Sequence, residues 1–306
     1  MMAKFEVKVS SPGRDGLVEN IMSTPLLDVE PKVVEHAFPF ASNFSDMHLL
    51  EFPGHGQLVS KRYGGRGIEM PLSIGQARAM SGLAKEFYLQ LRGTGLNVSV
   101  LRDAYPVRIF GGEHDGKYHV QVLQEYVPGQ NAVDVFKNAS GDERQALFQG
   151  LLKATQIITN SRPYAYTPQN PFESPIGFDA KPHNFMLTQD GDLVLVDLYA
   201  PLVRDPDGGF AFLRVIPELA VKDAGFQSLA YRLADKRGLY TKSILELAAV
   251  VPEAKTLLEE ETCAFLRKNE PAVLPVVEGE VNTSYRHYLS IVGDGERARF
   301  KPLTEK

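Results

Sequence analysis

Three side chains in the stretch GFDAKPHNFMLTQDGDLVLVDLYAP (residues 177–201) have the chemistry and the spacing of a metal-dependent catalytic site. Asp179 and Asn184 form a D-x-x-x-x-N pattern that encloses a K-P pair, and Asp197 follows them. The runs FMLT and LVLVDL are typical of strands, and the D-G pair between them is typical of a hairpin turn. Because a hairpin brings the outer ends of its strands together, we expect Asn184 and Asp197 to lie side by side. Two hard oxygen ligands suited to Mg²⁺ would then adjoin a carboxylate that can accept a proton.

A β-rich segment with one helix precedes this stretch and must support it. Alternating and β-branched residues predict three antiparallel strands, and the helix that follows has an apolar face and ends at a G-T-G sequence. Two further strand-like runs flank an H-D-G turn. The predicted strands span residues 33–38, 47–52, 57–63, 107–113 and 117–127, and the predicted helix spans 74–92. The expected order is therefore β-β-β-α-β-β.

From Asn131 onward, the apolar residues recur mainly at helical spacing. The predicted helices span residues 132–138, 142–159, 226–238, 241–251 and 253–269. The change near Pro128–Gly129 divides the chain into an N-terminal extension (1–30), a small β-rich lobe (31–128) and a larger helical lobe (129–306). We therefore expect an α+β fold with two lobes, and the cleft between two lobes is a common place for a small-ligand site.

The composition argues against several classes of protein. The chain has 306 residues and a net charge of -5, and its Lys and Arg residues are spread along the sequence. It therefore lacks the basic patch that binds nucleic acid or an anionic membrane surface. The N-terminal residues lack the apolar core of a secretory signal, no run reaches the roughly 18 apolar residues of a membrane span, and the single cysteine cannot form an internal disulfide. These features predict a cytoplasmic protein with neither a nucleic-acid nor a membrane partner.

The residues around Asp179 closely resemble the catalytic loop and metal-binding segment of the protein-kinase-like superfamily, H-R-D-x-K-P-x-N followed by D-F-G. The matching residues here are G-F-D-A-K-P-H-N and D-L-Y, at the usual interval. The resemblance implies a bilobal protein-kinase-like fold, with a small antiparallel β-rich N-lobe that contains one helix and a larger, mainly helical C-lobe. It implies that Asn184 and Asp197 hold Mg²⁺ on the phosphates of ATP. Asp179 would orient or deprotonate an acceptor hydroxyl, and Lys181 would neutralise charge on the transferred phosphoryl group.

The same resemblance implies further residues in the N-lobe. The third strand is expected to carry a lysine for the α- and β-phosphates of ATP, and Lys61 lies in that strand. The following helix is expected to present a glutamate to this lysine, and Glu86 lies there. The fifth strand is expected to lead into a hinge whose backbone meets the adenine, and the residues in that place are Gln124, Glu125, Tyr126 and Val127.

The sequence departs from the family pattern in two loops. The phosphate-covering loop of the family usually carries glycines, whereas the corresponding loop here, P-F-A-S-N-F-S-D, has none. Ser42, Asn43 and Ser45 are the expected donors to phosphate instead, as in small-molecule kinases that resemble aminoglycoside and choline phosphotransferases. Gly177 stands where the family has a histidine that braces the catalytic loop, and Tyr199 stands where it has the glycine of D-F-G.

The segment after Asp197 distinguishes among the kinase classes. It contains no A-P-E element and no evident activation loop, both of which a protein kinase normally carries. The predicted reaction is therefore transfer of the γ-phosphoryl group of ATP to a hydroxyl of a small molecule. The alternative is a pseudokinase that acts as a nucleotide-binding or scaffold protein, which the departures at the phosphate loop and Gly177 favour. A protein kinase is a third interpretation, which the missing A-P-E element disfavours.

Overall fold

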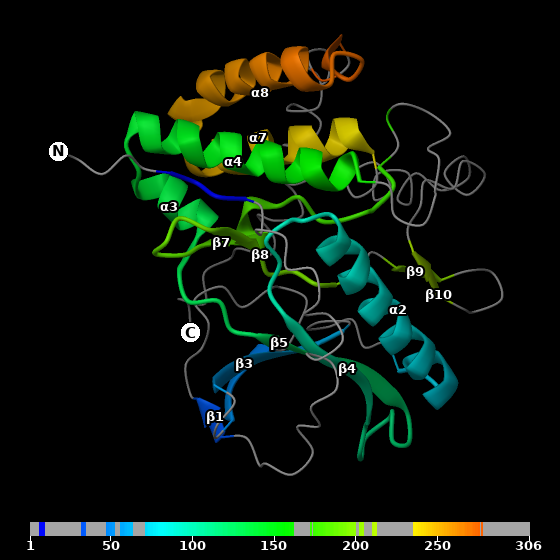
Figure 1. Cartoon of the computed structure of the whole chain (residues 1–306). Helices are drawn as coiled ribbons and strands as arrows, with labels where there is room; N and C mark the ends of the chain where they lie inside the picture. Colours follow the sequence, from blue (N-terminus) through cyan, green and yellow to red (C-terminus); the bar gives the residue numbers. More distant parts are fainter. Residues whose placement is uncertain are drawn as a thin grey trace, which may run out of the picture.

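A five-stranded antiparallel sheet is built in the order β1-β2-β3-β5-β4 by the part of the chain before residue 126. The computed structural model describes residues 6–9, 32–34, 47–52, 56–63, 71–161, 172, 174–199, 202–204, 210–212, 235–275 and 277. The strands are β1 (Lys32–Val34), β2 (Met47–Phe52), β3 (Gly56–Arg62), β4 (Leu101–Arg108) and β5 (Tyr118–Glu125). Helix α2 (Ile74–Gly93) follows β3 and packs beside β4 and β5 (Figure 1).

Strand β4 lies earlier in the sequence than predicted, whereas β2, β3 and α2 closely match their predicted ranges. The sequence predicts the fourth strand over 107–113, but the strand ends at Arg108. Gly111 and Gly112 have φ values of 75° and 71°, a left-handed conformation that ends the strand. Pro106 is accommodated inside β4 because β4 is an edge strand, where the missing N–H can face away from the sheet.

Local signals set the start and the inward face of α2. Ser73 Oγ accepts a hydrogen bond from Gln76 N (3.2 Å), and Gln76 Oε1 accepts one from Ser73 N (3.0 Å), which completes a capping box. The helix then buries apolar side chains at helical spacing. These residues are Ala77, Met80, Ala84, Phe87 and Leu91.

Helices dominate the second part of the chain, so the predicted α+β class is confirmed. The helices are α3 (Ala132–Asn138), α4 (Gly141–Thr159), α7 (Lys236–Val250) and α8 (Lys255–Asn269), with the one-turn helices η2 (Pro182–Asn184) and η3 (Pro252–Ala254). A small sheet of β6 (Gln130–Asn131), β7 (Phe185–Leu187) and β8 (Leu193–Leu195) lies between these helices and the N-terminal sheet (Figure 1). A separate pair contains β9 (Leu202–Arg204) and β10 (Phe210–Phe212). Most of the predicted helix 226–238 lies outside the described residues.

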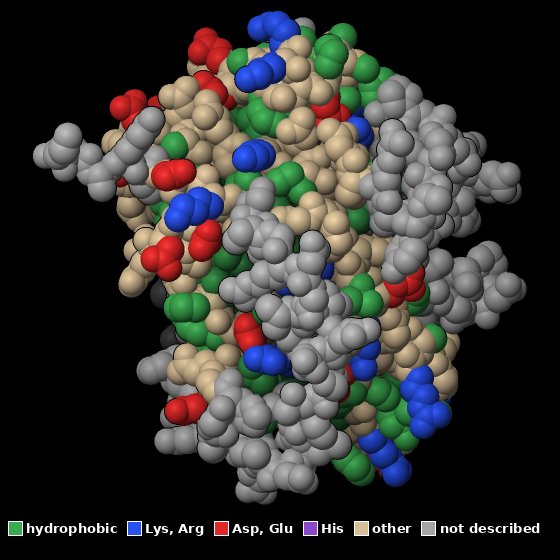
Figure 2. Space-filling view, viewed as in Figure 1, with side chains coloured by type: hydrophobic (Ala, Val, Ile, Leu, Met, Phe, Trp, Pro, Cys, Tyr) green, Lys and Arg blue, Asp and Glu red, His purple; other side chains and the backbone are tan. Residues whose placement is uncertain are grey.

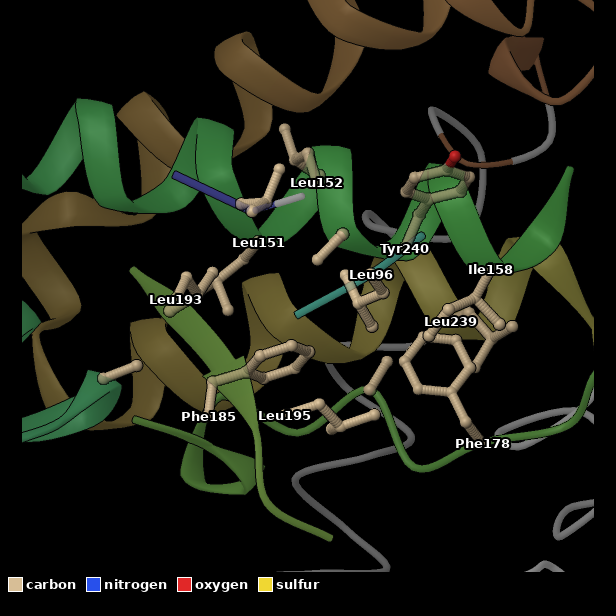
Figure 3. Packing of buried hydrophobic residues seen from close by; sticks show 14 of the residues in the cluster. Leu96, Leu151, Leu152, Ile158, Phe178, Phe185, Leu193, Leu195, Leu239 and Tyr240 are labelled. Atoms are coloured by element: carbon tan, nitrogen blue, oxygen red, sulfur yellow. The ribbon is translucent and has the colours of Figure 1, made fainter. Parts of the chain in front are cut away.

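One hydrophobic core joins the two parts of the molecule. It includes Phe87 and Leu91 of α2 together with buried side chains of α4, β7, β8 and α7. Figure 3 shows Leu151 of α4, Leu195 of β8 and Phe185 of β7 facing the same interior. Each fully buried Leu or Phe side chain contributes about 1.5–3 kcal/mol. The β7–β8 hairpin, which carries the predicted metal ligands at its ends, is therefore anchored in a core that both parts share.

The described part of the N-terminal extension adds a strand-like segment to the turn of this hairpin. Lys8 N donates a hydrogen bond to Gly191 O (2.7 Å), and Leu193 N donates one to Lys8 O (2.6 Å). The buried Val9 accepts a hydrogen bond from Asn97 N (3.1 Å) through its main-chain oxygen. The extension therefore links the hairpin turn to the segment that follows α2.

Gly191 allows the backbone of Glu6 to approach the hairpin turn closely, because glycine has no Cβ atom. Its φ is 82°, and a Cβ atom at this position would overlap the carbonyl oxygen of Glu6. Gly116, in the D-G turn of the β4–β5 hairpin, has a φ of 78°, but a Cβ there would have the Arg108 guanidinium no closer than 4.0 Å.

We expect Gly116→Ala to lower the free energy of unfolding by about 1–2 kcal/mol, the cost of the left-handed backbone alone. Gly191→Ala is expected to cost about 1–3 kcal/mol more, because it also displaces the backbone of Glu6. Urea denaturation of both variants measures the difference. Equal losses would show that Glu6 does not approach the turn closely in solution.

Candidate active site

The β7–β8 hairpin brings the two predicted metal ligands together. Strand β7 begins directly after Asn184, and Asp197 lies two residues beyond the end of β8. Phe185 pairs with Leu195 across the hairpin, and Val196 N donates a hydrogen bond to Asn184 O (2.8 Å). Strand pairing thereby places the Asn184 Nδ2 atom 3.3 Å from Asp197 Oδ2, within hydrogen-bond distance.

The loop before β7 brings Asp179 to the same place. Asn184 Nδ2 also donates a hydrogen bond to the main-chain oxygen of Asp179 (3.0 Å). The Asp179 carboxylate accepts a hydrogen bond from the Lys242 ammonium through Oδ1, and its Oδ2 lies 3.4 Å from Lys181 Nζ. Burial alone would raise the pKa of Asp179, but the two ammonium groups outweigh it and bring the pKa below its ordinary value. Asp179 is therefore an ionised carboxylate held between two cations.

Asp197 lies in an environment that disfavours its negative charge. Burial is the main influence on its pKa and raises it, Lys61 acts in the opposite direction, and the charge of Asp179 raises the pKa further. Tyr199 N donates to Asp197 Oδ1 only at 3.4 Å, which is long for a hydrogen bond. A cation bound at Asp197 would therefore relieve an unfavourable charge.

Lys61 of β3 is buried and reaches the chain immediately before Asp197. Its Nζ donates a hydrogen bond to Val196 O (2.7 Å), and Gln124 Nε2 of β5 donates to the same oxygen (2.8 Å). Burial lowers the pKa of Lys61, and the nearby Asp197 carboxylate partly offsets this effect. Two side chains of the N-terminal sheet thus bind the carbonyl group that precedes Asp197.

Glu86 does not form the ion pair that the sequence predicts. Its carboxylate accepts a hydrogen bond from Gln90 Nε2, one turn along α2 (3.3 Å), and among the described residues no ion pair joins Glu86 to Lys61. The reason is the rotation of the helix. Phe87 and Leu91 take the inward positions against the core, and Glu86 is left on a half-buried flank.

Tyr199 makes a contact between the N-terminal sheet and the segment after β8 that the sequence did not indicate. Its hydroxyl donates a hydrogen bond to Arg62 O (2.7 Å), and its ring centroid lies 4.3 Å from that of Tyr63. Lys61 Nζ lies 5.8 Å from the Tyr199 ring centroid, within the range of about 6 Å for a cation–π attraction. Leu198, at the Phe position of D-F-G, is buried.

Of the four predicted hinge residues, Gln124 lies near the end of β5 with its side chain buried. Glu125 forms an ion pair with Arg102 of β4, and the Tyr126 N–H donates a hydrogen bond to the backbone of β3 (3.1 Å). Val127 is half-buried beyond the strand. Outside the described residues lie the three predicted phosphate-loop residues, Ser42, Asn43 and Ser45.

Helix α7 contacts the loop that contains Asp179 through three polar side chains that sequence reasoning missed. The contacts are Lys242 Nζ to Asp179 Oδ1, Ser243 Oγ to Ala180 O (3.0 Å) and Glu246 Oε2 to His183 Nδ1 (3.5 Å). The one signal in the sequence is a lysine within a mainly apolar helical run. The loop is fixed on its other flank by the core, because Gly177 is buried and Phe178 packs among the apolar side chains (Figure 3).

The described residues contain no group of three or more His, Cys, Asp or Glu side chains arranged for a metal ion. Asn184 and Asp197 are the two predicted ligands that the hairpin brings within hydrogen-bond distance of each other. Figure 2 shows Lys and Arg side chains distributed from the top to the bottom of the described surface, with Asp and Glu side chains among them. Within the ranges that the structure describes, no helix combines the length and apolar character of a membrane span.

Neither a scan against protein-family models nor a search of the curated proteins found a match to this chain.

Proposed function

We propose that this protein is an ATP- and Mg²⁺-dependent phosphotransferase that moves the γ-phosphoryl group of ATP to a hydroxyl of a small molecule. The observation that carries the proposal is the convergence of Asp179, Asn184 and Asp197 at the ends of one hairpin. Lys61, from the N-terminal sheet, approaches the same segment. A base or orienting carboxylate, two metal ligands and a phosphate-binding lysine are the groups that phosphoryl transfer requires.

A bilobal protein-kinase-like fold is part of the proposal. The order of the elements supports it, because the sheet with α2 between its third and fourth strands precedes the helices, and the β7–β8 hairpin is inserted among those helices. The sequence motif around Asp179 and the placement of Lys61 are separate observations that agree with this order.

The donor set at the hairpin suits Mg²⁺. Asn184 uses its Nδ2 in both of its side-chain hydrogen bonds, which leaves Oδ1 for a cation, and Asp197 supplies a carboxylate. Mg²⁺ prefers oxygen ligands and usually takes one or two from the protein, with phosphate oxygens and water completing its coordination. When bound, the ion would neutralise charge on the β- and γ-phosphates.

The chemistry is a displacement at phosphorus. A bond forms between the acceptor oxygen and the γ-phosphorus, and the bond to the β-phosphate oxygen breaks with its electron pair remaining on ADP. Asp179 would accept a hydrogen bond from the acceptor hydroxyl and then its proton. Lys181 would neutralise charge on the transferred phosphoryl group. Lys61 would exchange its contact with Val196 O for a phosphate oxygen. Most of the catalysis would come from positioning and charge neutralisation, because the transition state is loose.

A scaffold or nucleotide-binding protein without transfer activity is the second candidate. The absence of a Lys61–Glu86 pair within the described part of the chain favours it, since an active member of the family is expected to have this pair. A protein kinase is a third candidate, and the same experiment separates all three.

The test is incubation of the full chain with γ-labelled ATP, Mg²⁺ and either pooled small hydroxyl compounds or a protein mixture. We expect label on a small molecule, and Asp179→Ala is expected to lower the rate by about 10²–10⁴-fold through loss of the orienting carboxylate. Asp190→Ala is the control, because Asp190 is exposed in the turn of the same hairpin. Label on proteins alone would identify a protein kinase, and ATP binding without transfer would identify the scaffold.

A further inference from the structure

Lys242 is a buried lysine of α7, flanked by the buried hydroxyl residues Thr241 and Ser243. It is 5% exposed, and Leu239, Ile244 and Leu245 around it on α7 are also buried. Burying an ammonium group is unfavourable unless an anion pairs with it. The anion is Asp179 in the catalytic loop, 63 residues earlier in the chain. The burial of Lys242 is thus compensated at the proposed active site.

The two oxygen atoms of Asp179 have different surroundings. Oδ1 is held by the buried Lys242, whereas Oδ2 lies 3.4 Å from Lys181, whose side chain is 36% exposed. An incoming hydroxyl can therefore approach Oδ2 with little rearrangement, but it would have to displace a buried ion pair to reach Oδ1. The other two contacts of α7, at Ala180 and His183, fix the loop in the same orientation.

We propose that Lys242 is a positioning residue: it holds Oδ1 of Asp179 so that Oδ2 alone receives the acceptor hydroxyl. This inference rests on the proposed phosphotransferase function. Helix α7 thereby takes over the bracing of the catalytic loop, at whose start Gly177 replaces the histidine of the related motif. As the acceptor oxygen bonds to the γ-phosphorus and ADP departs with the electron pair of the broken bond, the hydroxyl proton passes to Oδ2.

The first test is the steady-state kinetics of Lys242→Met with labelled ATP and Mg²⁺, using the pooled hydroxyl compounds or water as the acceptor. A misplacement of about 1 Å in a reacting group costs on the order of 10²-fold, so we expect kcat to fall by roughly 30–100-fold. The KM for ATP is expected to change by less than about twofold, because Lys242 does not contact the predicted nucleotide-binding residues. Lys242→Arg keeps a charged donor and is expected to restore part of kcat.

Lys236→Met is the matched control. Lys236 is also a mostly buried lysine of α7 in an ion pair, but its partner is Glu270 and not the catalytic loop. We expect this variant to melt at a lower temperature and to retain the wild-type kcat. A wild-type kcat in Lys242→Met, or an equal fall in both variants, would overturn the positioning role.

The second test does not require turnover. A buried, paired ammonium group exchanges its protons slowly, so the ¹H–¹⁵N signal of Lys242 Nζ is expected in the wild type and is expected to shift or vanish in Asp179→Asn. An unchanged signal would overturn the contact and the proposal. If the signal responds but the wild type neither transfers nor hydrolyses ATP, the contact stands and the phosphotransferase function fails, together with the role of Lys242 in it.

Discussion

Asp197→Ala is expected to abolish the stabilisation of this protein by ATP with Mg²⁺ and to lower phosphoryl transfer by about 10²–10³-fold. In the proposed site Asp197 supplies the one carboxylate ligand. In the variant, the neutral amide oxygen of Asn184 would be the remaining protein ligand of the metal ion. A ligand present at 100 times its dissociation constant adds about 2.7 kcal/mol to the free energy of unfolding. Thermal unfolding with and without ATP and Mg²⁺ measures this gain directly.

The same substitution is expected to leave the unliganded protein as stable as the wild type, or more stable. Burial raises the pKa of Asp197 and outweighs the opposite influence of the Lys61 ammonium, and the charge of Asp179 raises the pKa further, so the ionised carboxylate is unfavourable there without a bound metal ion. Removing the Asp197 carboxylate removes this unfavourable burial of charge. Functional groups in binding sites commonly lower the stability of the unliganded protein for such reasons.

Asp192→Ala is the matched control for Asp197→Ala, because Asp192 lies at the opposite end of β8 in the turn of the same hairpin. It is expected to keep the full stabilisation by ATP and Mg²⁺. Persistence of a Mg²⁺-dependent gain in Asp197→Ala would refute the assignment of the metal ligands. Loss of the gain in both variants would indicate that the hairpin as a whole, and not one carboxylate, supports binding.

Glu270→Ala is expected to lower the free energy of unfolding by about 3–5 kcal/mol, because Glu270 is a buried partner of an ion pair. Glu270 is buried after the end of α8, and it ties α8 to the end of α4 and the start of α7. Its partners are Tyr240 Oη (2.5 Å), Lys236 Nζ (2.9 Å), Asn160 Nδ2 (3.4 Å) and Thr159 Oγ1 (3.5 Å).

Removing the carboxylate leaves the Lys236 ammonium, whose side chain is only 12% exposed, without its counter-charge. Breaking one side of a buried ion pair costs about 3–5 kcal/mol. The thermal midpoint is expected to fall by roughly 2–4 °C for each kcal/mol lost. Glu270→Gln keeps a hydrogen-bond acceptor and is expected to lose less.

Glu253→Ala is the control for this network. Glu253 also pairs with a cation, Arg144, but at 3.9 Å and with its side chain 72% exposed. Exposed pairs contribute about 0–1 kcal/mol, so this variant is expected to unfold almost like the wild type. A loss in Glu270→Ala no larger than that in Glu253→Ala would show that the buried network is not formed in solution.

Short-range patterns predicted the parts of the candidate site that depend on local structure. The D-G turn and its flanking apolar runs specified the β7–β8 hairpin, and that hairpin brings Asn184 to Asp197. Lys61 was placed correctly in β3, which spans Gly56–Arg62 against the predicted 57–63. These features follow from periods of a few residues, which a single sequence contains.

The contacts that depend on how distant elements pack were not predictable in this way. The sequence around Lys242 does not show that its partner is Asp179, because that contact depends on how α7 packs on the loop that contains Asp179. The predicted pairing of Glu86 failed because the rotation of α2 is set by Phe87 and Leu91, which the core buries. A helical pattern identifies which side chains of a helix are buried. It does not identify which of the polar side chains next to that buried face will contact a residue of a particular strand.

The contact of Lys8 with the hairpin turn has a consequence for the order of folding. Lys8 bonds to Gly191 and Leu193, so its place in the structure is built by residues that the ribosome synthesises more than 180 positions later. Contacts of such long sequence separation form late, because the intervening loop must first be closed. During synthesis, Lys8 must therefore lack both of these partners until the hairpin emerges from the ribosome, and it can bond to the turn only after β7 and β8 have been made.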